Sequence, residues 1–482
     1  MKKIYLTLFL LLFSTSAFAF DVCEHEKKYS QIWYVNNCGG ETLVIKKEKK
    51  KETTKKESKK SKLYTSTSKN ELPEWANPTD KVLKYYAKKY SKHSKTRKGF
   101  KFKIKASENF RKFNFNLRTD DYVNQQLKDT ALLSYLVFEN DTIVQDEITP
   151  EDRFGKYFKN DTKWQSMSMG KSIISYIAGH AICRGYISGI NETLDWDIFD
   201  KTLYERQKLI NVLNMSSGSK EYKDVQGFKN SKRWVNNPTT QSVMKKELKN
   251  SRAGDIRYNY SNMDTNVVAS YVLYKMGQDN FVNLLNEIFA NKVGIEHDIF
   301  LFKQEDAKKK TPSLTYSFYI TRYDFLRIAV AMLEDWNKNT CEGQYLKSLW
   351  ENRINKVQKY KIDEECKGCN TWDASPKCFE EIGKPKKQCV LDGDQSYGED
   401  GYKWIENENI SIYRNSNDAF TNPKQYGGQF HLGISGKRDT PIFIMDGFGG
   451  QTININFEDK KIISTLSVHR NYNWMKLVHE KL

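Results

Sequence analysis

The stretch WQSMSMGKSIISYIAGHAICRG, residues 164–185, indicates both the fold and the chemistry of this chain. From Lys171 onward its apolar residues recur at helical spacing, and Gly185 ends the run, which predicts a mostly buried helix. Ser168 stands at the amino end of that helix, three residues before Lys171. Because residues three apart on a helix share a face, the serine oxygen and the lysine amine can meet.

This pairing matters because a serine hydroxyl is a weak nucleophile until a nearby base removes its proton. Lys171 becomes such a base if burial and neighbouring cations lower the pKa of its amine. The amino end of a helix also offers N–H donors and partial positive charge to a developing oxyanion. The same spacing occurs at Ser66 and at Ser217, but only the copy at Ser168 opens an apolar helix, where an idle lysine is costly to bury.

Two later segments supply further candidates. The residues YSN, Tyr260 to Asn262, form a predicted turn before a helix over 260–277, where a phenol can relay a proton and an amide can hold a carbonyl. The stretch DGFGGQTININF, residues 446–457, is a glycine-rich turn entering a strand, which lets backbone approach a ligand closely. Each segment is a weak signal alone, since the second also fits an ordinary hairpin. Their order along the chain is the stronger signal.

The remaining pattern predicts the fold class. Residues 132–147, LLSYLVFENDTIVQDE, place two β-rich runs on either side of END, as in a hairpin. Helical patterns follow over 209–218 and 321–336, and β-rich runs return between residues 429 and 468. Strands first, helices in the middle and strands last predict an α+β fold, with an antiparallel β-sheet built from both chain ends and a helical region packed on it.

Taken together, these segments resemble the serine beta-lactamase and penicillin-binding-protein-like hydrolases, especially the class C beta-lactamase-related esterases and the 6-aminohexanoate-dimer hydrolases. The resemblance covers residues 130–470 and includes the block INVLNMSSG, residues 210–218. It implies that Ser168 is the acylated nucleophile and that Lys171 and Tyr260 form the base system. By the same resemblance, Asn262 orients the substrate, and the family's third motif corresponds to Phe448, Gly449, Gly450 and Gln451. The backbone N–H groups of Ser168 and Gln451 would then form the oxyanion hole.

One position departs from the family's pattern. Phe448 stands where lysine or histidine commonly leads the glycines, and the family's lactamases and transpeptidases use that cation to bind a substrate carboxylate. The departure argues against a beta-lactam or a peptidoglycan stem peptide as substrate, and it leaves acyl transfer to water intact. We therefore expect a serine hydrolase acting on a small ester or amide, with no cofactor or metal. A DD-peptidase or beta-lactamase, and a catalytically silent envelope-binding protein, are the alternatives.

Other candidate residues carry less weight. No glycine–x–serine–x–glycine motif occurs, which argues against a standard α/β-hydrolase. His180 lies on the apolar helix and is expected to be a satisfied core histidine. His431 could line the site, although a histidine on a strand is usually structural. Asp446 adjoins the glycine turn and could orient a polar group of the substrate.

The amino end predicts export. Two lysines, an apolar run and small residues up to Ala19 match a secretory signal over residues 1–19, with an uncleaved anchor as the alternative. A periplasmic or secreted location follows. The net charge is +18, and residues 46–62 alone hold ten lysines and three glutamates. We interpret 46–79 as a solvated basic linker between a short segment, 20–45, and the hydrolase domain, 80–482.

The linker could associate with an anionic envelope surface through screened attraction. Nucleic-acid binding is disfavoured, because the charge is concentrated in low-complexity sequence of a chain expected to be exported. The oligomeric state is not predicted.

The chain has eight cysteines, and the expected export favours disulfides over metal ligands for them. Cys23 and Cys38 are expected to pair. A loop-like insertion over 341–395 is expected to be stapled by disulfides, with a zinc ribbon as the alternative; its cysteines are Cys341, Cys366, Cys369, Cys378 and Cys389. Cys183 is expected to be a buried free thiol.

Overall fold

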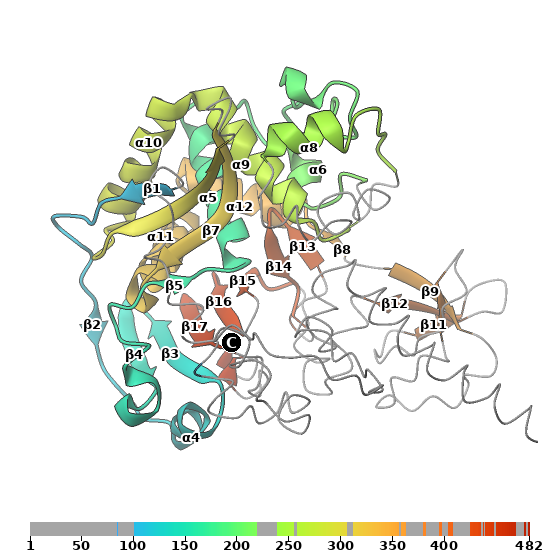
Figure 1. Cartoon of the computed structure of the whole chain (residues 1–482). Coiled ribbons are helices and arrows are strands. Elements are labelled where there is room, and N and C mark those ends of the chain that lie inside the picture. Colours follow the sequence, from blue (N-terminus) through green and yellow to red (C-terminus); the bar gives the residue numbers. More distant parts are fainter. Residues whose placement is uncertain are drawn as a thin grey trace, which may run out of the picture. The chain divides into compact units, whose positions relative to one another are not determined.

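A computed structural model describes most of the chain from residue 101 onward (Figure 1). The described residues are Lys84, 101–218, 239–254, 258–305, 312–355, 358–362, 379–381, 395–397, 403–407, 425–434, 437, 439–447, 450–468, 477–478 and 481–482. They belong to one unit, Trp75–Tyr222 with Asn237–Leu482. The expected signal, the segment 20–45, the linker, Phe448, Gly449 and the four cysteines from Cys366 to Cys389 lie outside the described residues.

The largest sheet joins both ends of the described chain. Its strands, in spatial order, are β2 (Asn114–Phe115), β4 (Thr142–Ile148), β3 (Leu132–Glu139), β17 (Lys461–Ser467), β16 (Gln451–Asn456), β15 (Ile442–Gly447), β14 (Phe430–Leu432), β13 (Gln425–Gly427) and β8 (Ile354–Asn355). Neighbours pair antiparallel, apart from the parallel pair β2 and β4. Figure 1 shows the early strands β3 and β4 beside the late strands β16 and β17. The predicted α+β fold with a sheet from both chain ends is confirmed.

The predicted hairpin over 132–147 is β3 followed by β4. Asn140 and Asp141 at its tip both have positive φ, 47° and 62°. Two successive residues in that conformation are typical of the type I′ turn, whose twist matches that of the strands it joins. The residues END therefore set the position of this hairpin.

The helices lie between these strands in the sequence. They are α4 (Asp121–Asp129), α5 (Met169–Cys183), α6 (Leu209–Leu213), α8 (Thr240–Lys246), α9 (Asn262–Met276), α10 (Gln278–Asn286), α11 (Arg322–Lys338) and α12 (Cys341–Glu351). Helix α5 is buried along its whole length except its last two residues, and it packs against α9, α12, β7 and β15. A helix that is apolar on every side belongs in a core, as the pattern after Lys171 predicted.

Two smaller sheets were not predicted. One has the order β1 (Lys101–Ile104), β6 (Ile299–Glu305), β7 (Pro312–Ile320) and β5 (Trp164–Gln165). The other has the order β10 (Phe379–Glu381), β9 (Gln358–Ile362), β12 (Lys403–Asn407) and β11 (Gln395–Tyr397). The first bears on function, because β5 directly precedes Ser168 and pairs with the end of β7.

The expectation of a loop-like insertion from residue 341 is wrong at its start. Residues 341–351 form helix α12, whose first turn is capped by the Thr340 side chain accepting a hydrogen bond from Gly343 N at 3.1 Å. Helix α12 packs against both α5 and α11. A capping threonine and an amphipathic pattern were present in the sequence, but the cysteines dominated its interpretation.

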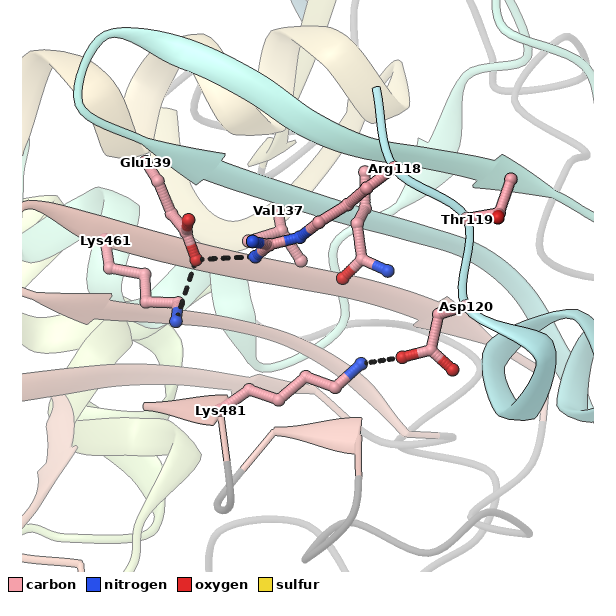
Figure 2. Close-up of a pocket in the computed structure, with 8 residues that line it drawn as sticks. Arg118, Thr119, Asp120, Val137, Glu139, Lys461 and Lys481 are labelled. Carbon is pink, nitrogen blue, oxygen red and sulfur yellow. Dashed lines mark hydrogen bonds and ion pairs between the residues drawn. The ribbon is translucent and has the colours of Figure 1, made fainter. Parts of the chain in front are cut away.

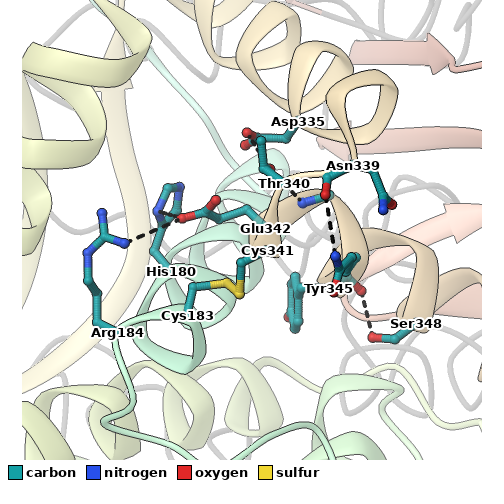
Figure 3. The surroundings of a disulfide bond; sticks show 12 residues. His180, Cys183, Arg184, Asp335, Asn339, Thr340, Cys341, Glu342, Tyr345 and Ser348 are labelled. Atoms are coloured by element: carbon teal, nitrogen blue, oxygen red, sulfur yellow. Dashed lines mark hydrogen bonds and ion pairs between the residues drawn. A yellow bond between two sulfur atoms is a disulfide. The ribbon is translucent and has the colours of Figure 1, made fainter.

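The expected free thiol at Cys183 is also wrong. Cys183, the last residue of α5, forms a disulfide with Cys341, the first residue of α12 (Figure 3). The two Cα atoms lie 5.8 Å apart, because α12 packs across the end of α5. The disulfide therefore joins the helix that begins at Ser168 to a segment 158 residues away.

His180 lies in the core, as predicted, but its buried Nε2 has no hydrogen-bond partner among the described residues, so it is not fully satisfied. Its side chain is 1% exposed, and its Nδ1 lies 3.0 Å from the Glu342 carboxylate, beside the disulfide (Figure 3). Glu342 also pairs with Lys292 at 3.0 Å. Burial lowers the pKa of His180, and Glu342 acts in the opposite direction. These contacts occupy the histidine at the far end of α5 from Ser168.

Candidate functional site

The loop before α5 holds Ser168 at the amino end of the helix. Ser166 makes two hydrogen bonds to Phe318 of β7. Its backbone N–H donates to Phe318 O at 2.9 Å, and its Oγ accepts from Phe318 N at 3.0 Å. Met167 then takes a left-handed backbone, with φ of 47°. Such a conformation is uncommon for a residue with a side chain, and it persists only where the surroundings hold it. Ser168 follows, half-buried, as the N-cap residue of α5.

Gly170 allows strand β7 to approach α5 closely. A Cβ at this position would lie 1.8 Å from the backbone oxygen of Tyr316. No side chain fits at that distance, so this glycine has a steric reason in the packing. Its consequence is that Tyr316 comes to lie beside Lys171.

Lys171 is buried among uncharged groups. Its side chain is 1% exposed, and its Nζ donates a hydrogen bond to Asn262 Oδ1 at 2.6 Å. The Nζ also lies 3.2 Å from the ring centroid of Tyr316 and 5.2 Å from that of Tyr260. No carboxylate of the described residues lies within ion-pair distance of this amine. The structure thus brings Lys171, Tyr260 and Asn262 together.

The electrostatics of this environment favour the neutral amine. Burial lowers the pKa of Lys171 well below its usual value, and the charge of Asp264 acts in the opposite direction. A buried ammonium without a paired anion loses its hydration with little compensation. A neutral amine has a free electron pair, so it can accept a proton from a hydroxyl.

Tyr260 lies near both the lysine and the serine. Burial raises the pKa of this phenol, the neighbouring Tyr316 adds to the rise, and the Ser168 hydroxyl opposes it. His431 of β14 stacks near it, with ring centroids 6.2 Å apart. Tyr426 lies edge-on to the Tyr260 ring at 6.4 Å. Tyr260 is thus a neutral phenol close to the serine, and the ring of His431 lies beside it.

The glycine-rich turn lies against the serine segment. A Cβ on Gly447, at the end of β15, would meet Ser166 O at 2.9 Å and Met169 Cγ at 3.2 Å. Gly447 pairs with Gln451, which is fully buried at the start of β16. Gly450 precedes it with φ of 78°, a conformation that favours glycine. The Gly447 end of the turn therefore lies against the amino end of α5, while the tip of the turn lies outside the described residues.

Asp446 lies next to this turn and is partly exposed. After burial and the neighbouring phenols, its charge is among those that raise the pKa of Tyr260. It is therefore close enough to Tyr260 for its charge to act on that phenol.

Two residues of the site were missed in the sequence. Tyr316 lies on β7, and its alternating apolar context gave no sign that its ring would cover a lysine 145 positions earlier. Asp264 follows Asn262 by two residues in the first turn of α9. An acid there reads as an ordinary helix start, although its complete burial sets it apart in the structure.

A cavity of about 280 Å³ lies elsewhere on the large sheet and contains none of the predicted site residues (Figure 2). Each of its charged groups is in an ion pair: Glu139 bonds to Arg118 at 3.0 Å and to Lys461 at 2.8 Å, and Lys481 bonds to Asp120. Lys461 pairs with Asn456, the opposite end of β16 from Gln451. The cavity and the serine therefore lie at different ends of the sheet strands.

Within the described ranges, no helix combines the length and apolar character needed to cross a membrane. The same part of the chain has no group of three or more histidine, cysteine, aspartate or glutamate side chains placed to hold a metal ion.

The fold has counterparts among solved structures. One is a protein described as a 6-aminohexanoate-dimer hydrolase from Bacillus anthracis, 14% identical, with a TM-score of 0.52 over 82% of this chain and 92% of that chain. The chain has the serine beta-lactamase and penicillin-binding-protein-like fold.

Two further similar structures are a beta-lactamase from Bacteroides dorei and FmtA from Staphylococcus aureus. Their identities are 14% and 11%, and both TM-scores are 0.44. The Bacteroides dorei match covers 72% of this chain and 87% of that chain, and the FmtA match covers 79% of this chain and 92% of that chain. The fold assignment rests on the Bacillus anthracis structure. No protein-family model and no curated protein matches the sequence.

Proposed function

We propose that the protein is a serine hydrolase that forms an acyl-enzyme at Ser168 and releases it to water. The observation that carries the proposal is the Lys171 amine, 1% exposed, bonded to the amide of Asn262 and without a carboxylate at ion-pair distance among the described residues. A lysine kept in that environment is costly unless its neutral form is used. Its position one helical turn after a half-buried serine supports a role in activating that serine.

The proposed reaction has two halves. In the first, Ser168 Oγ attacks the substrate carbonyl carbon, its proton passes to the Lys171 and Tyr260 base system, and the leaving group departs with that proton. In the second, water attacks the acyl carbon and gives a proton to the same base system. The bond between the acyl carbon and Ser168 Oγ then breaks, the serine oxygen takes that proton, and the carboxylic acid leaves. The N–H groups of Ser168 and Gln451 would stabilise the oxyanion in both halves, and Asn262 would orient the substrate.

The proposed substrate is a small ester or amide without a required carboxylate. Phe448 stands in the third motif where a cation would bind such a group. The aromatic rings of Tyr260 and Tyr316 lie near the Lys171 amine, and that of Tyr426 packs against Tyr260, which suits an apolar or weakly polar acyl group. The signal-like sequence up to Ala19 and the basic linker support export to an envelope compartment.

The test is hydrolysis of p-nitrophenyl esters and anilides of increasing acyl length, with intact mass recorded during turnover. We expect saturable hydrolysis and a transient mass increase equal to one acyl group. Ser168→Ala should lose both. Ser172→Ala is a matched control, because Ser172 lies on the same helix and its hydroxyl only donates to Gln429 O at 2.7 Å. Equal turnover by Ser168→Ala and the unaltered protein would refute the proposal, and no turnover or adduct in either would favour the silent binding protein.

A further inference from the structure

The first turn of α9 contains a buried carboxyl behind the Lys171–Asn262 contact. Asp264 is fully buried, and its Oδ1 accepts hydrogen bonds from Tyr204 Oη at 2.6 Å and Ser217 Oγ at 2.9 Å. Its backbone N–H donates to the N-cap residue Ser261 at 3.3 Å. The same turn carries Asn262, so the carboxyl is fixed to the element that holds the lysine amine.

The partners of Asp264 come from outside α9. Ser217 belongs to the turn that follows α6, and Tyr204 lies earlier in the chain. The backbone of that turn also holds the segment before α9, because Asn259 N donates to Met215 O at 2.8 Å. The Asp264 carboxyl thus joins the turn at Met215–Gly218, the MSSG block, to the turn that carries Tyr260 and Asn262.

The carboxyl also acts on the charge of the site. The titratable groups whose charges interact with it are Lys171 of α5, Tyr204 and Tyr426. Burial raises the pKa of Asp264 to about 7, its two donors and Lys171 opposing the rise. Asp264 and Lys171 are therefore a coupled pair, in which ionisation of the acid favours protonation of the amine.

We propose that Asp264 is a positioning residue for the site, whose bonds to Tyr204 and Ser217 hold Asn262 against the Lys171 amine and whose carboxylate interacts with that amine. The inference rests on the proposed function, since it assigns Lys171 a working neutral form. It gives the MSSG block a physical role, which is to hold the turn opposite the nucleophile through Ser217.

The test compares the rate at which a fluorophosphonate labels Ser168, measured from pH 5 to 10 in each variant. The labelling rate should fall at low pH as Lys171 becomes protonated, and this fall is the acid limb of the profile. Asp264→Asn keeps an acceptor for Tyr204 and Ser217 but removes the charge that favours the protonated amine, so the acid limb should move to lower pH by roughly one unit. Asp264→Leu removes the acceptor as well, so its rate should fall at every pH. Coinciding acid limbs in Asp264→Asn and the unaltered protein would overturn the inference.

Asp335→Asn is the matched control. Asp335 is likewise a buried aspartate that accepts from a tyrosine, Tyr176 at 2.5 Å, but it lies on α11 beside the far part of α5. This variant should leave the acid limb unchanged. A shift of the same size in Asp335→Asn would show that loss of any buried carboxylate suffices, which also contradicts the assignment.

A second readout separates this inference from the proposed function. In protein carrying [ε-¹³C]lysine, the Lys171 signal is identified by its absence from Lys171→Arg, and its titration gives the pKa of the amine directly. Asp264→Asn should lower that pKa even if no probe labels Ser168. Failure of labelling alone would count against the hydrolase, whereas an unchanged lysine pKa would count against the role of Asp264.

Discussion

The amine of Lys171 lies 2.6 Å from Oδ1 of Asn262, an uncharged acceptor that leaves the buried amine without a neutralising partner at contact distance. A structural lysine in a core is ordinarily paired with a carboxylate, because an unpaired buried charge is expensive. Here the same contact both restrains the amine and leaves it free to lose its proton.

Removal of the amine should abolish acylation and leave the fold intact. We expect Lys171→Met, which keeps most of the side-chain volume, and Lys171→Ala to reduce fluorophosphonate labelling by about 10²-fold or more, the usual contribution of a general base. Their thermal unfolding should differ little from that of the unaltered protein, or improve in the methionine variant, since a buried polar group is lost. Unchanged labelling with normal folding would remove Lys171 from the base system.

Tyr316 should control the pH at which the site works. Its ring covers the Lys171 amine at 3.2 Å and keeps water away from it. Tyr316→Ala admits water, so the pKa of Lys171 should rise toward its usual value and the acid limb of activity should move to higher pH. Tyr316→Phe keeps the ring and should behave like the unaltered protein. A pH–rate profile distinguishes the two variants. If the acid limb moved as far in Tyr316→Phe as in Tyr316→Ala, the Tyr316 hydroxyl and not the ring would control the pKa of Lys171.

The Cys183–Cys341 disulfide should stabilise the protein without taking part in the chemistry. It joins positions 158 residues apart, and loss of such a cross-link ordinarily costs about 2–5 kcal/mol of the free energy of unfolding. The Cys183→Ser, Cys341→Ser double variant should therefore unfold at lower denaturant concentration but label at Ser168 normally at low temperature. Equal denaturation midpoints with and without the disulfide would contradict this.

Asp264 should make stability depend on pH below neutrality. Its pKa is raised to about 7, whereas in the unfolded chain it returns to its ordinary range. Between about pH 4 and pH 7 the folded protein keeps a proton on Asp264 that the unfolded chain releases. The stabilisation from Asp264 is therefore fully present below this window and is lost as the pH rises through it. The free energy of unfolding relative to Asp264→Asn should fall by about 2–4 kcal/mol across the window. Urea denaturation at a series of pH values measures it, and a constant difference would refute the raised pKa.

Local patterns predicted the parts of the fold that local forces determine. The apolar run after Lys171 predicted α5, and END predicted the β3–β4 hairpin, because helical spacing and turn residues act over a few positions. The four-stranded sheet containing β5 and β7 was missed, since its strands come from distant parts of the chain.

The same distinction applies to the site. The motifs containing Ser168, Lys171, Tyr260 and Asn262 could be located in the sequence, and the structure places these residues together. The ring of Tyr316 over Lys171 depends on the close approach at Gly170, which only the packed structure reveals. The pairing of Cys183 was likewise hidden, because sequence spacing carries no information about which helices lie side by side.

The most direct test of the central claim is fluorophosphonate labelling of the protein at pH 8, read by intact mass and by fragmentation of the labelled peptide. The proposed site predicts one adduct per chain, located at Ser168, retained in Ser172→Ala and lost in Ser168→Ala and Lys171→Met. An adduct at a different serine, or one that persists in Lys171→Met at the same rate, would contradict activation of Ser168 by the buried lysine.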